Sequence, residues 1–333
     1  MKPVILFVDD EPNILDGLRR FTRGQRHAWD MHFADGGAAA PETVAREPVD
    51  VVVCDMRMPG IAGADVLERI SRCAGHHPLH PVGEAEPEQV YRAVGRSHRF
   101  FGKPCDPEAL IAAIEAPLAL IREIGSDVAE RGASFLDRLQ SPPAAFDALG
   151  KLLERPGAQP ADVAAIVARD PSLAVRLLQL VNSAYFGRPV ETCNIARALD
   201  AIGLDRLRAL LVRRRLGNNG GQTGASPPQH ERAWRLADRA AALAVAAGVA
   251  PADSDVVYAA ALFARLGQRE TPTGTFPPIA APSAAYATTL LGLPARLTEA
   301  LRRLAQIPAA EGDLDADARA VCVAALPAPR IAA

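Results

Sequence analysis

Four charged residues stand where short apolar runs end, and their types suit phosphoryl transfer. Asp9 and Asp10 follow the run "VILFV", Asp55 follows "VVVC", and Lys103 follows "FFG". Carboxylates crowded at one point repel one another, and a bound cation relieves that repulsion. Hard oxygen ligands suit Mg²⁺, which keeps open positions for water and phosphate oxygens. The set predicts phosphoryl transfer to a carboxylate, with Lys103 pairing with the incoming phosphoryl group.

Each aspartate alone has a simpler interpretation. Asp is common where a strand is followed by a turn. For any one of these aspartates taken alone, a loop cap is therefore the favoured interpretation over a metal ligand. The four charges meet only if the segments that carry them form neighbouring parallel strands, because the carboxyl ends of such strands share one edge of the sheet. The chemistry therefore depends on the fold of this region.

Strand and helix patterns alternate over about the first 120 residues. Strand-like apolar runs occupy residues 4–8, 29–34, 49–54 and 99–104. Between them lie helical patterns, the first with an apolar face made of Ile14, Leu15, Leu18 and Phe21. A later helix has a clear start, with Asp106 as the N-cap and Pro107 in the first turn. This alternation predicts an α/β fold with a doubly wound parallel sheet.

From about residue 125 the strand pattern disappears. Residues 160–187 predict two helices separated by Asp170-Pro171, and the Ala- and Leu-rich remainder is mostly helical in pattern. Two segments, 217–229 and 270–283, are rich in Gly, Asn and Pro and are expected to be surface loops. The second half of the chain is therefore expected to be an all-α domain.

The bulk composition excludes several classes of protein. The chain has 333 residues, a net charge of −2 and 49% hydrophobic residues, without the basic excess of a typical nucleic-acid-binding protein. No apolar run reaches the roughly 20 residues that a membrane span requires, so we expect a cytoplasmic protein. The five cysteines form no CxxC pair, which predicts neither a disulfide framework nor a zinc site.

The N-terminal motifs resemble the receiver domain of two-component response regulators. The segments "FVDDEPNIL", "VVVCDMRMPGIAGADVL" and "FFGKPCDPEAL" occur in the family's order within residues 1–122. The resemblance implies a flavodoxin-like fold with five parallel strands, and a histidine kinase or phosphotransfer protein as phosphoryl donor. It also implies these roles: Asp55 as phosphoacceptor; Asp9, Asp10, Asp55 and the Arg57 carbonyl as Mg²⁺ ligands; Lys103 as phosphoryl contact; Phe101 as aromatic switch.

One position departs from the family pattern. Receivers end the fourth strand with a Ser or Thr that binds the phosphoryl oxygen, and here Val82 aligns with that position. Valine cannot donate this hydrogen bond. The segment also contains Pro78 and Pro81, which a central strand should not contain. The readout of phosphorylation is therefore expected to be impaired, and a degenerate receiver that acts as a dimerisation surface stays open as an alternative.

The second half resembles the HDOD domain, an all-helical relative of the HD metal-dependent phosphohydrolases. The segments "DPSLAVRLLQLVNSAYFG" and "NIARALDAIGLDRLR" carry the likeness. An HD site requires His and Asp ligands on several helices. Of the seven histidines, His230 alone lies in this half, and Leu236, Ala264 and Arg265 stand where hydrolases have ligands. The domain is therefore expected not to be an enzyme, which disfavours a cyclic-dinucleotide phosphodiesterase.

These patterns predict a response regulator of a two-component phosphorelay. Its expected parts are a receiver at 1–122, a helical connector at 123–135, an HDOD domain at 136–310 and a tail or last helix at 311–333. The HDOD domain is expected to contact a downstream signalling protein, and a homodimer stays open. The basic segment 206–215 leaves a DNA-binding regulator as a rival, but a solvated helix face is the favoured interpretation.

Overall fold

The structure is a computed structural model that describes residues 2–46, 48–61, 63–73, 81–82, 98–101, 105–137, 141–183, 191–212, 227–264, 281–307 and 314–326. The chain forms two compact units, the first mainly from residues up to Ser126 and the second mainly from Asp127 onward. Among the helices described, none combines the length and apolar character needed to cross a membrane.

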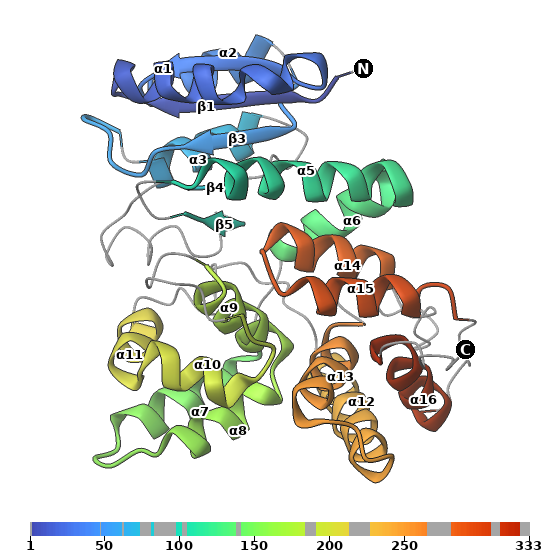
Figure 1. Cartoon of the computed structure of the whole chain (residues 1–333). Helices are drawn as coiled ribbons and strands as arrows, with labels where there is room; N and C mark the ends of the chain where they lie inside the picture. The colour runs from blue at the N-terminus through green and yellow to red at the C-terminus, as the bar shows by residue number, and fades with distance from the viewer. Residues whose placement is uncertain are drawn as a thin grey trace. The chain divides into compact units, whose positions relative to one another are not determined.

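A parallel sheet of five strands forms the centre of the first unit (Figure 1). The strands are β1 (Val4–Asp9), β2 (Asp30–Asp35), β3 (Val51–Cys54), β4 (Pro81–Val82) and β5 (Arg99–Phe100). Their order in the sheet is β2-β1-β3-β4-β5, and every neighbouring pair is parallel. The predicted parallel sheet is confirmed.

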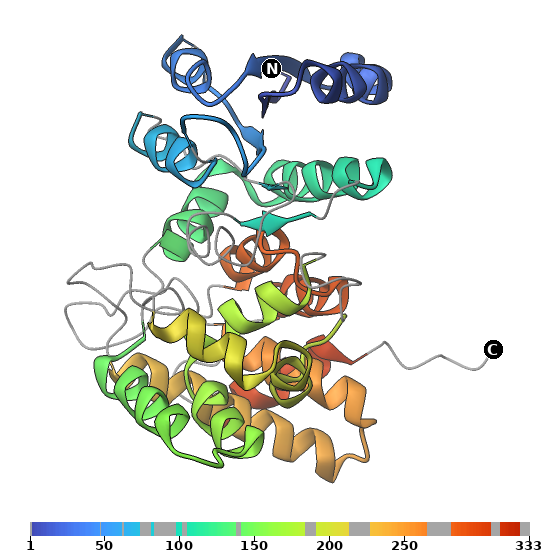
Figure 2. The same cartoon turned by 90° about the vertical axis from the view of Figure 1, so that its left-hand side faces the viewer.

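Helices cover both faces of this sheet. They are α1 (Pro12–Phe21), α2 (Ala40–Arg46), α3 (Gly63–Cys73) and α5 (Pro107–Ile124), with the short 3₁₀ helix η1 (Thr22–His27) after α1. Figure 2 shows α1 and α5 on one side of the strands and α2 and α3 on the other. The interior strand β1 needs both layers, because Ile5, Leu6 and Phe7 are completely buried.

Helix α1 differs in one detail from the predicted apolar face. Leu15 is buried, but Ile14 is 37% exposed. Successive helix residues are separated by about 100° around the axis, so a face centred on Leu15 turns Ile14 toward solvent. The prediction that Ile14 shares the buried face was therefore wrong.

Strand β4 is short and begins with a proline. It pairs with β3 through Val82 and Cys54, and with β5 through Pro81 and Arg99 and through Val82 and Phe100. The expectation that a central strand should not contain Pro81 needs correction. Proline is tolerated as the first residue of a strand, where the ladder needs no amide from it.

Helix α5 begins as predicted and ends inside the expected connector. The Asp106 side chain accepts a hydrogen bond from the Glu108 amide at 3.0 Å, which confirms the N-cap. The helix ends at Gly125, whose φ of +86° favours glycine, and α6 (Ser126–Asp137) follows at once. The segment 123–135 is helical apart from this break.

The second unit is helical throughout its described residues. Its helices after α6 are α7 (Pro143–Glu154), α8 (Pro160–Ala168), α9 (Pro171–Val181), α10 (Ile195–Ile202), α11 (Leu204–Val212), α12 (Pro227–Ala246), α13 (Pro251–Phe263), α14 (Ala281–Leu290), α15 (Ala295–Leu304) and α16 (Leu314–Ala325). The break between α8 and α9 at Asp170 was predicted correctly. Helices α12 and α14 begin inside the predicted loops 217–229 and 270–283, so those loop boundaries were wrong.

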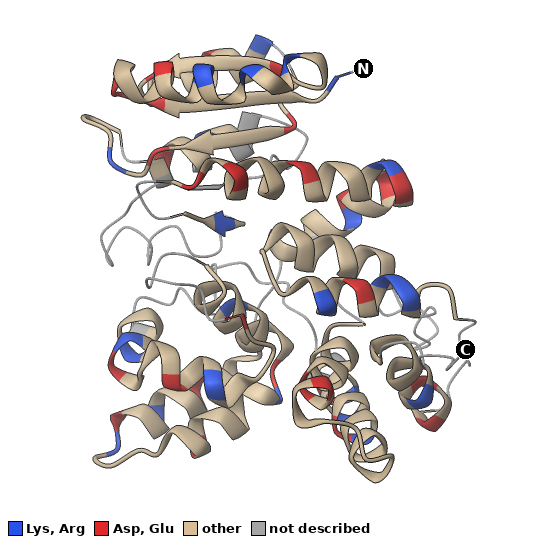
Figure 3. Cartoon of the chain, viewed as in Figure 1, with Lys and Arg blue, Asp and Glu red and all other residues tan. Residues whose placement is uncertain are grey.

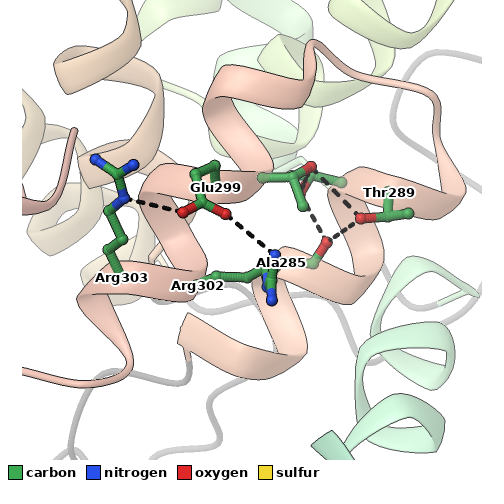
Figure 4. Close-up of polar contacts among 7 residues, drawn as sticks. Ala285, Thr289, Glu299, Arg302 and Arg303 are labelled. Atoms are coloured by element: carbon green, nitrogen blue, oxygen red, sulfur yellow. Dashed lines mark hydrogen bonds and ion pairs between the residues drawn. The ribbon is translucent and has the colours of Figure 1, made fainter. Parts of the chain in front are cut away.

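Side-chain hydrogen bonds lie within α14 and α15 and between them. The Thr288 and Thr298 hydroxyls lie 3.3 Å apart, and Thr289 donates to the Ala285 carbonyl at 2.8 Å. Glu299 accepts from Arg302 and Arg303, at 3.1 and 2.9 Å (Figure 4).

Helix α16 is the last described helix and lies within the segment 311–333 that was expected to be a tail or a last helix.

Candidate functional site

The three aspartates meet at the carboxyl ends of β1 and β3. Asp9 is the last residue of β1, Asp10 follows it, and Asp55 comes directly after β3. The register pairs Val8 with Cys54, and the Asp55 amide donates to the Val8 carbonyl at 2.8 Å. Asp9 and Asp55 are only 4% and 6% exposed. The strand ends thus place these carboxylates together, as the sequence predicted.

The carboxylates are held by backbone amides of the adjacent loops. The Glu11 amide donates to Asp9 Oδ1 at 2.9 Å, and the Arg57 amide donates to Asp55 Oδ2 at 3.1 Å. One ligand oxygen from each of Asp9, Asp10 and Asp55 lies within 4.8 Å of the others. Three clustered carboxylates are hard oxygen donors, and this donor set fits Mg²⁺.

Close packing on the Asp55 loop depends on a glycine. A Cβ atom on Gly63 would lie 2.2 Å from the Asp55 carbonyl oxygen and 2.9 Å from Met56 Cα. The Gly63 amide also donates to the Met56 carbonyl at 3.2 Å. The first turn of α3 therefore rests directly on the loop backbone and limits how far Asp55 can move.

The neighbouring thiol of Cys54 has a packing role. It is completely buried, and its Sγ donates to the Asp55 carbonyl at 3.2 Å. Burial raises the pKa of the Cys54 thiol, and the charges of Asp55 and Asp9 raise it further. A thiol kept neutral in this way is a poor nucleophile and a poor metal ligand.

The other predicted site residues are placed only in part. Lys103 lies outside the described residues. Val82 ends β4 and pairs with Cys54, so its backbone lies beside the strand that leads to Asp55. Phe101 is half-buried just after β5, with the Arg99 guanidinium carbon 5.8 Å from its ring centroid. The roles of Phe101 and of the Arg57 carbonyl stay predictions.

In the second unit, two of the positions that the resemblance aligns with hydrolase ligands are buried and apolar. Leu236 and Ala264 are completely buried among other side chains. Arg265, the third such position, lies outside the described residues. A buried leucine and a buried alanine cannot bind a metal ion, so these two positions supply no ligand.

A buried polar cluster that the sequence did not reveal lies between α9 and α12. His230 Nε2 lies 3.3 Å from Asp170 Oδ1 and 3.3 Å from Ser172 Oγ. Asp170 also caps α9, accepting from the amides of Ser172 and Leu173 at 2.9 and 3.1 Å. In the sequence, this cluster could be recognised only at Asp170, which precedes the proline that starts α9. A single histidine such as His230 has no spacing pattern that indicates its partner.

Comparisons with known families match both halves of the chain. The family described as "Response regulator receiver domain" matches residues 5–115, and the family described as "HDOD domain" matches residues 139–270. The three clustered aspartates lie in the first match, and the His230 cluster lies in the second. Helices α14 to α16 follow the end of the second match.

Individual relatives each match about a third of the chain. The hydrogenase transcriptional regulatory protein HoxA of Cupriavidus necator is 30% identical over 110 residues, which are 32% of this chain and 22% of HoxA. The response regulator UvrY of Escherichia coli K12 is 28% identical over 135 residues, 38% of this chain and 59% of UvrY. The chain thus spans less than two thirds of either relative.

A solved structure with a similar sequence is the signal receiver domain of an HD domain-containing protein from Pseudomonas fluorescens Pf-5. The two sequences are 25% identical, and the TM-score is 0.32. The match covers 34% of this chain and 85% of the chain of the solved receiver domain.

Proposed function

Because the chain joins a response regulator receiver domain at residues 5–115 to an HDOD domain at residues 139–270, we propose that it accepts a phosphoryl group at Asp55 in a two-component phosphorelay. A receiver domain implies a histidine kinase as its general partner, and a phosphotransfer protein is the other donor of this class. The HDOD domain would then pass the signal on through contacts with another protein.

The observation that carries the proposal is the cluster of Asp9, Asp10 and Asp55, with ligand oxygens within 4.8 Å of one another. These side chains would hold Mg²⁺, together with the Arg57 carbonyl. The bound ion would neutralise the carboxylates and the incoming phosphoryl oxygens. Asp9 and Asp55 are buried, and carboxylates this close together repel one another unless a cation is bound.

The proposed transfer starts from the position of Asp55. One carboxylate oxygen attacks phosphorus, a P–O bond forms, and the bond from phosphorus to the donor's histidine nitrogen breaks. The Arg57 amide already holds Oδ2 at 3.1 Å, which orients the carboxylate before the donor arrives. Lys103 is proposed to contact the phosphoryl group.

We propose that the HDOD domain is not an enzyme. Leu236 and Ala264 are both completely buried where the hydrolases of the related family place ligands. His230, the single histidine of this half, is already in contact with Asp170 and Ser172. A metal-dependent phosphodiesterase would need several more ligands than these residues supply.

Val82 supports a second candidate function. A valine at the position of the usual hydroxyl cannot donate a hydrogen bond to a phosphoryl oxygen. A degenerate receiver that acts as a constitutive scaffold, including as a homodimer, would also contain the residues described above. Phosphorylation itself separates the two candidates.

The test is intact-mass spectrometry after incubation with acetyl phosphate and Mg²⁺. The native chain should gain the mass of one phosphoryl group, and the gain should disappear in the presence of a chelator. Asp55→Asn should abolish it. Asp35→Asn is the matched control, because Asp35 ends the neighbouring strand β2 at the same edge of the sheet but is exposed and outside the cluster.

Two results would contradict the proposal. One is the absence of a gain while a receiver of known activity is labelled in parallel, which would leave the scaffold as the function. The other is a gain that persists in Asp55→Asn, which would place the phosphoryl group elsewhere.

A further inference from the structure

Four basic side chains form an exposed surface where α1 is followed by η1, and we call it the α1 basic surface. It consists of Lys2, Arg19, Arg23 and Arg26, which are all exposed. Lys2, Arg19 and Arg26 line one open hollow of the first unit. Arg23 lies four residues after Arg19 and three before Arg26, and this spacing brings helical side chains to one side. Figure 3 shows basic residues along α1.

The positive charge of this surface is bounded by one carboxylate at each end. Residues 17–29 contain four arginines and no Asp or Glu, and Asp16 and Asp30 flank them. Asp16 accepts a hydrogen bond from Arg19 Nη1 at 2.9 Å, and Asp30 lines the hollow. The basic side chains outnumber these two carboxylates, so the surface attracts anions.

The donors of Arg23 and Arg26 are available to a ligand. Lys2 Nζ donates to the Arg26 carbonyl at 2.8 Å, which holds the chain start against η1. Among the residues that the structure describes, no acceptor binds the guanidinium of Arg23 or of Arg26. A guanidinium has five N–H donors in a planar fork, and this fork matches the two oxygens of a carboxylate.

Apolar groups take little part in this surface. Trp29 is only 2% exposed. The Phe33 ring stacks on Phe7 with centroids 5.0 Å apart, and the Arg19 guanidinium carbon lies 4.7 Å from the Phe33 centroid. Both rings are covered, so recognition here depends on charge. Helices that lie on membranes bury an apolar face in the lipid, and the α1 basic surface has none to offer.

The length of the surface favours a short ligand. Arg26 is seven residues after Arg19, partly in α1 and partly in η1. At a rise of about 1.5–2.0 Å per residue, the row is about 12 Å long. An extended peptide covers this distance with about four residues. A long polyanion such as a nucleic acid backbone would continue past Asp16 and Asp30, whose carboxylates would repel it.

We propose that the α1 basic surface binds a short acidic segment of a partner protein, with about four Asp or Glu residues. Arg23 and Arg26 would pair with carboxylates of this segment, and Lys2 would add a third cation. Arginine is enriched in protein–protein interfaces, where its rigid fork loses less freedom per hydrogen bond than lysine does.

The surface is remote from the phosphoacceptor. Asp30 pairs with Val4 at the start of β1, whereas the aspartate cluster follows the end of β1 at Asp9. Five steps along a strand at about 3.3 Å each separate them by about 17 Å. The acidic partner and the phosphoryl donor would therefore use different ends of the sheet, and the binding of one can be measured independently of the other.

The experiment titrates a fluorescein-labelled tetraglutamate peptide with the full-length protein at low ionic strength and follows the fluorescence anisotropy. Saturable binding that weakens as salt rises is expected, and a tetraglutamine peptide should not bind. Arg23→Gln and Arg26→Gln should each weaken binding about threefold, and the double variant about tenfold. Arg46→Gln is the matched control, since Arg46 is an exposed arginine in the last turn of α2, on the other face of the sheet. It should leave the affinity within about 1.5-fold of the native value.

Several outcomes would overturn the proposal. They are the absence of saturable binding, equal losses in Arg26→Gln and Arg46→Gln, or an octaglutamate peptide that binds more than about tenfold tighter than tetraglutamate, which would indicate a surface without ends. Tighter binding of duplex DNA or of phosphatidylserine vesicles would assign the surface to a nucleic acid or to a membrane instead. Circular dichroism checks that each variant folds, and Lys2→Gln replaces one that does not.

Discussion

Asp170 is a carboxylate that the second unit buries almost completely, at 2% exposure, so its hydrogen bonds determine whether that region is stable. Its Oδ1 atom receives two backbone amides at the start of α9 and faces His230 Nε2. Within the described residues its Oδ2 atom has no hydrogen-bond partner. A buried carboxylate with few donors is sensitive to the loss of any one of them.

His230→Ala is therefore expected to lower the free energy of unfolding by about 1–3 kcal/mol, because it removes the ring that contacts Asp170 and Ser172 in a buried place. Urea denaturation followed by circular dichroism measures the change. His27→Ala is the control, since the His27 side chain is exposed and its Nδ1 lies 2.8 Å from the carbonyl oxygen of the nearby Gly24. A loss for His230→Ala no larger than that of the control would contradict the expectation.

Cys105 provides a second test at a single side chain. Burial, together with the charge of Asp106, raises the pKa of the Cys105 thiol to about 11. At pH 8 the thiolate fraction is then far below that of an ordinary cysteine, whose pKa is about 8.5. Alkylation of Cys105 by iodoacetamide should be slow in the folded protein and should accelerate as the pH rises toward 11.

Peptide mass mapping measures this reaction for Cys105 alone. Asp106→Asn should increase the rate at pH 8, because it removes a charge and keeps a side-chain oxygen that can cap α5. The increase should be partial, since burial is the larger cause of the raised pKa. Equal rates in the folded protein and in urea would show that the thiol is not perturbed.

The aspartate cluster could be predicted from the sequence because each of its members follows an apolar run, and parallel strands end at one edge of a sheet. The contact of His230 with Asp170 could not be predicted in this way. The two residues are far apart in the chain, and no spacing rule links the first turn of α12 to the start of α9. Only the packing of helices brings them together.

Helix contacts in this protein depend on particular glycines, and Gly63 at the start of α3 is the one nearest the proposed chemistry. A Cβ atom there would lie 2.2 Å from the Asp55 carbonyl oxygen. Gly63→Ala is expected to lower stability by about 1–3 kcal/mol through overpacking and to slow phosphorylation of Asp55. Thermal unfolding and the initial rate of labelling by acetyl phosphate measure the two effects.

Gly17→Ala is the control for this substitution, because nothing lies within 4 Å of a Cβ atom at Gly17 in α1. It should raise stability by about 0.5–1 kcal/mol and leave labelling unchanged. If Gly63→Ala behaved like Gly17→Ala, the close contact between α3 and the Asp55 loop would not constrain the site.

Gly132 has the same role where α6 meets α14. A Cβ atom on Gly132 would lie 2.5 Å from the Ser283 carbonyl oxygen, and Ser283 Oγ donates to the Val128 carbonyl at 3.2 Å. Gly132→Ala is expected to reduce the free energy of unfolding in urea by about 1–3 kcal/mol without slowing phosphorylation. Gly150→Ala in α7, with nothing within 4 Å, is its control. Slower phosphorylation in Gly132→Ala would contradict a purely structural role.

Helix boundaries and faces were predicted less well than strand positions. The loops 217–229 and 270–283 were assigned from Gly, Asn and Pro content, yet α12 and α14 begin at Pro227 and Ala281 within them. Proline suits the first turn of a helix as well as a loop, so composition alone cannot separate the two. Ile14 was misplaced because local periodicity does not show which arc of α1 the sheet covers.

Across the whole chain, near-neutral charge argues against nucleic acid as a partner. The net charge is −2, and in the basic segment 206–215 Arg208 already contacts the Asp205 carboxylate and the Leu153 carbonyl, at 2.7 and 2.6 Å. Residues 213–215 lie outside the described part. We expect no shift of duplex DNA in a mobility assay at moderate salt. A shift that weakens as salt rises would contradict this and support a DNA-binding regulator.

The order of the two domains was predictable because the motifs of each lie close together in the sequence. The boundaries 1–122, 123–135, 136–310 and 311–333 depend on contacts between distant segments and stay predictions. Helix α16 illustrates the difficulty, since Arg239 of α12 holds its Asp315 through two hydrogen bonds, at 2.6 and 3.0 Å. The C-terminal sequence alone does not predict these hydrogen bonds between α12 and α16.

The pairing of β4 has a consequence for how this chain can change over generations. Asp9, Asp10 and Asp55 follow β1 and β3, which pair at four residue positions, whereas in the described part of the chain β4 pairs with β3 at Val82 and Cys54. Mutations around β4 are therefore expected to affect the part that would detect a phosphoryl group and to spare the part that is proposed to accept it. On the proposed function, we expect acceptance and detection of a phosphoryl group to be separable traits, so that a lineage could lose the second while it keeps the first.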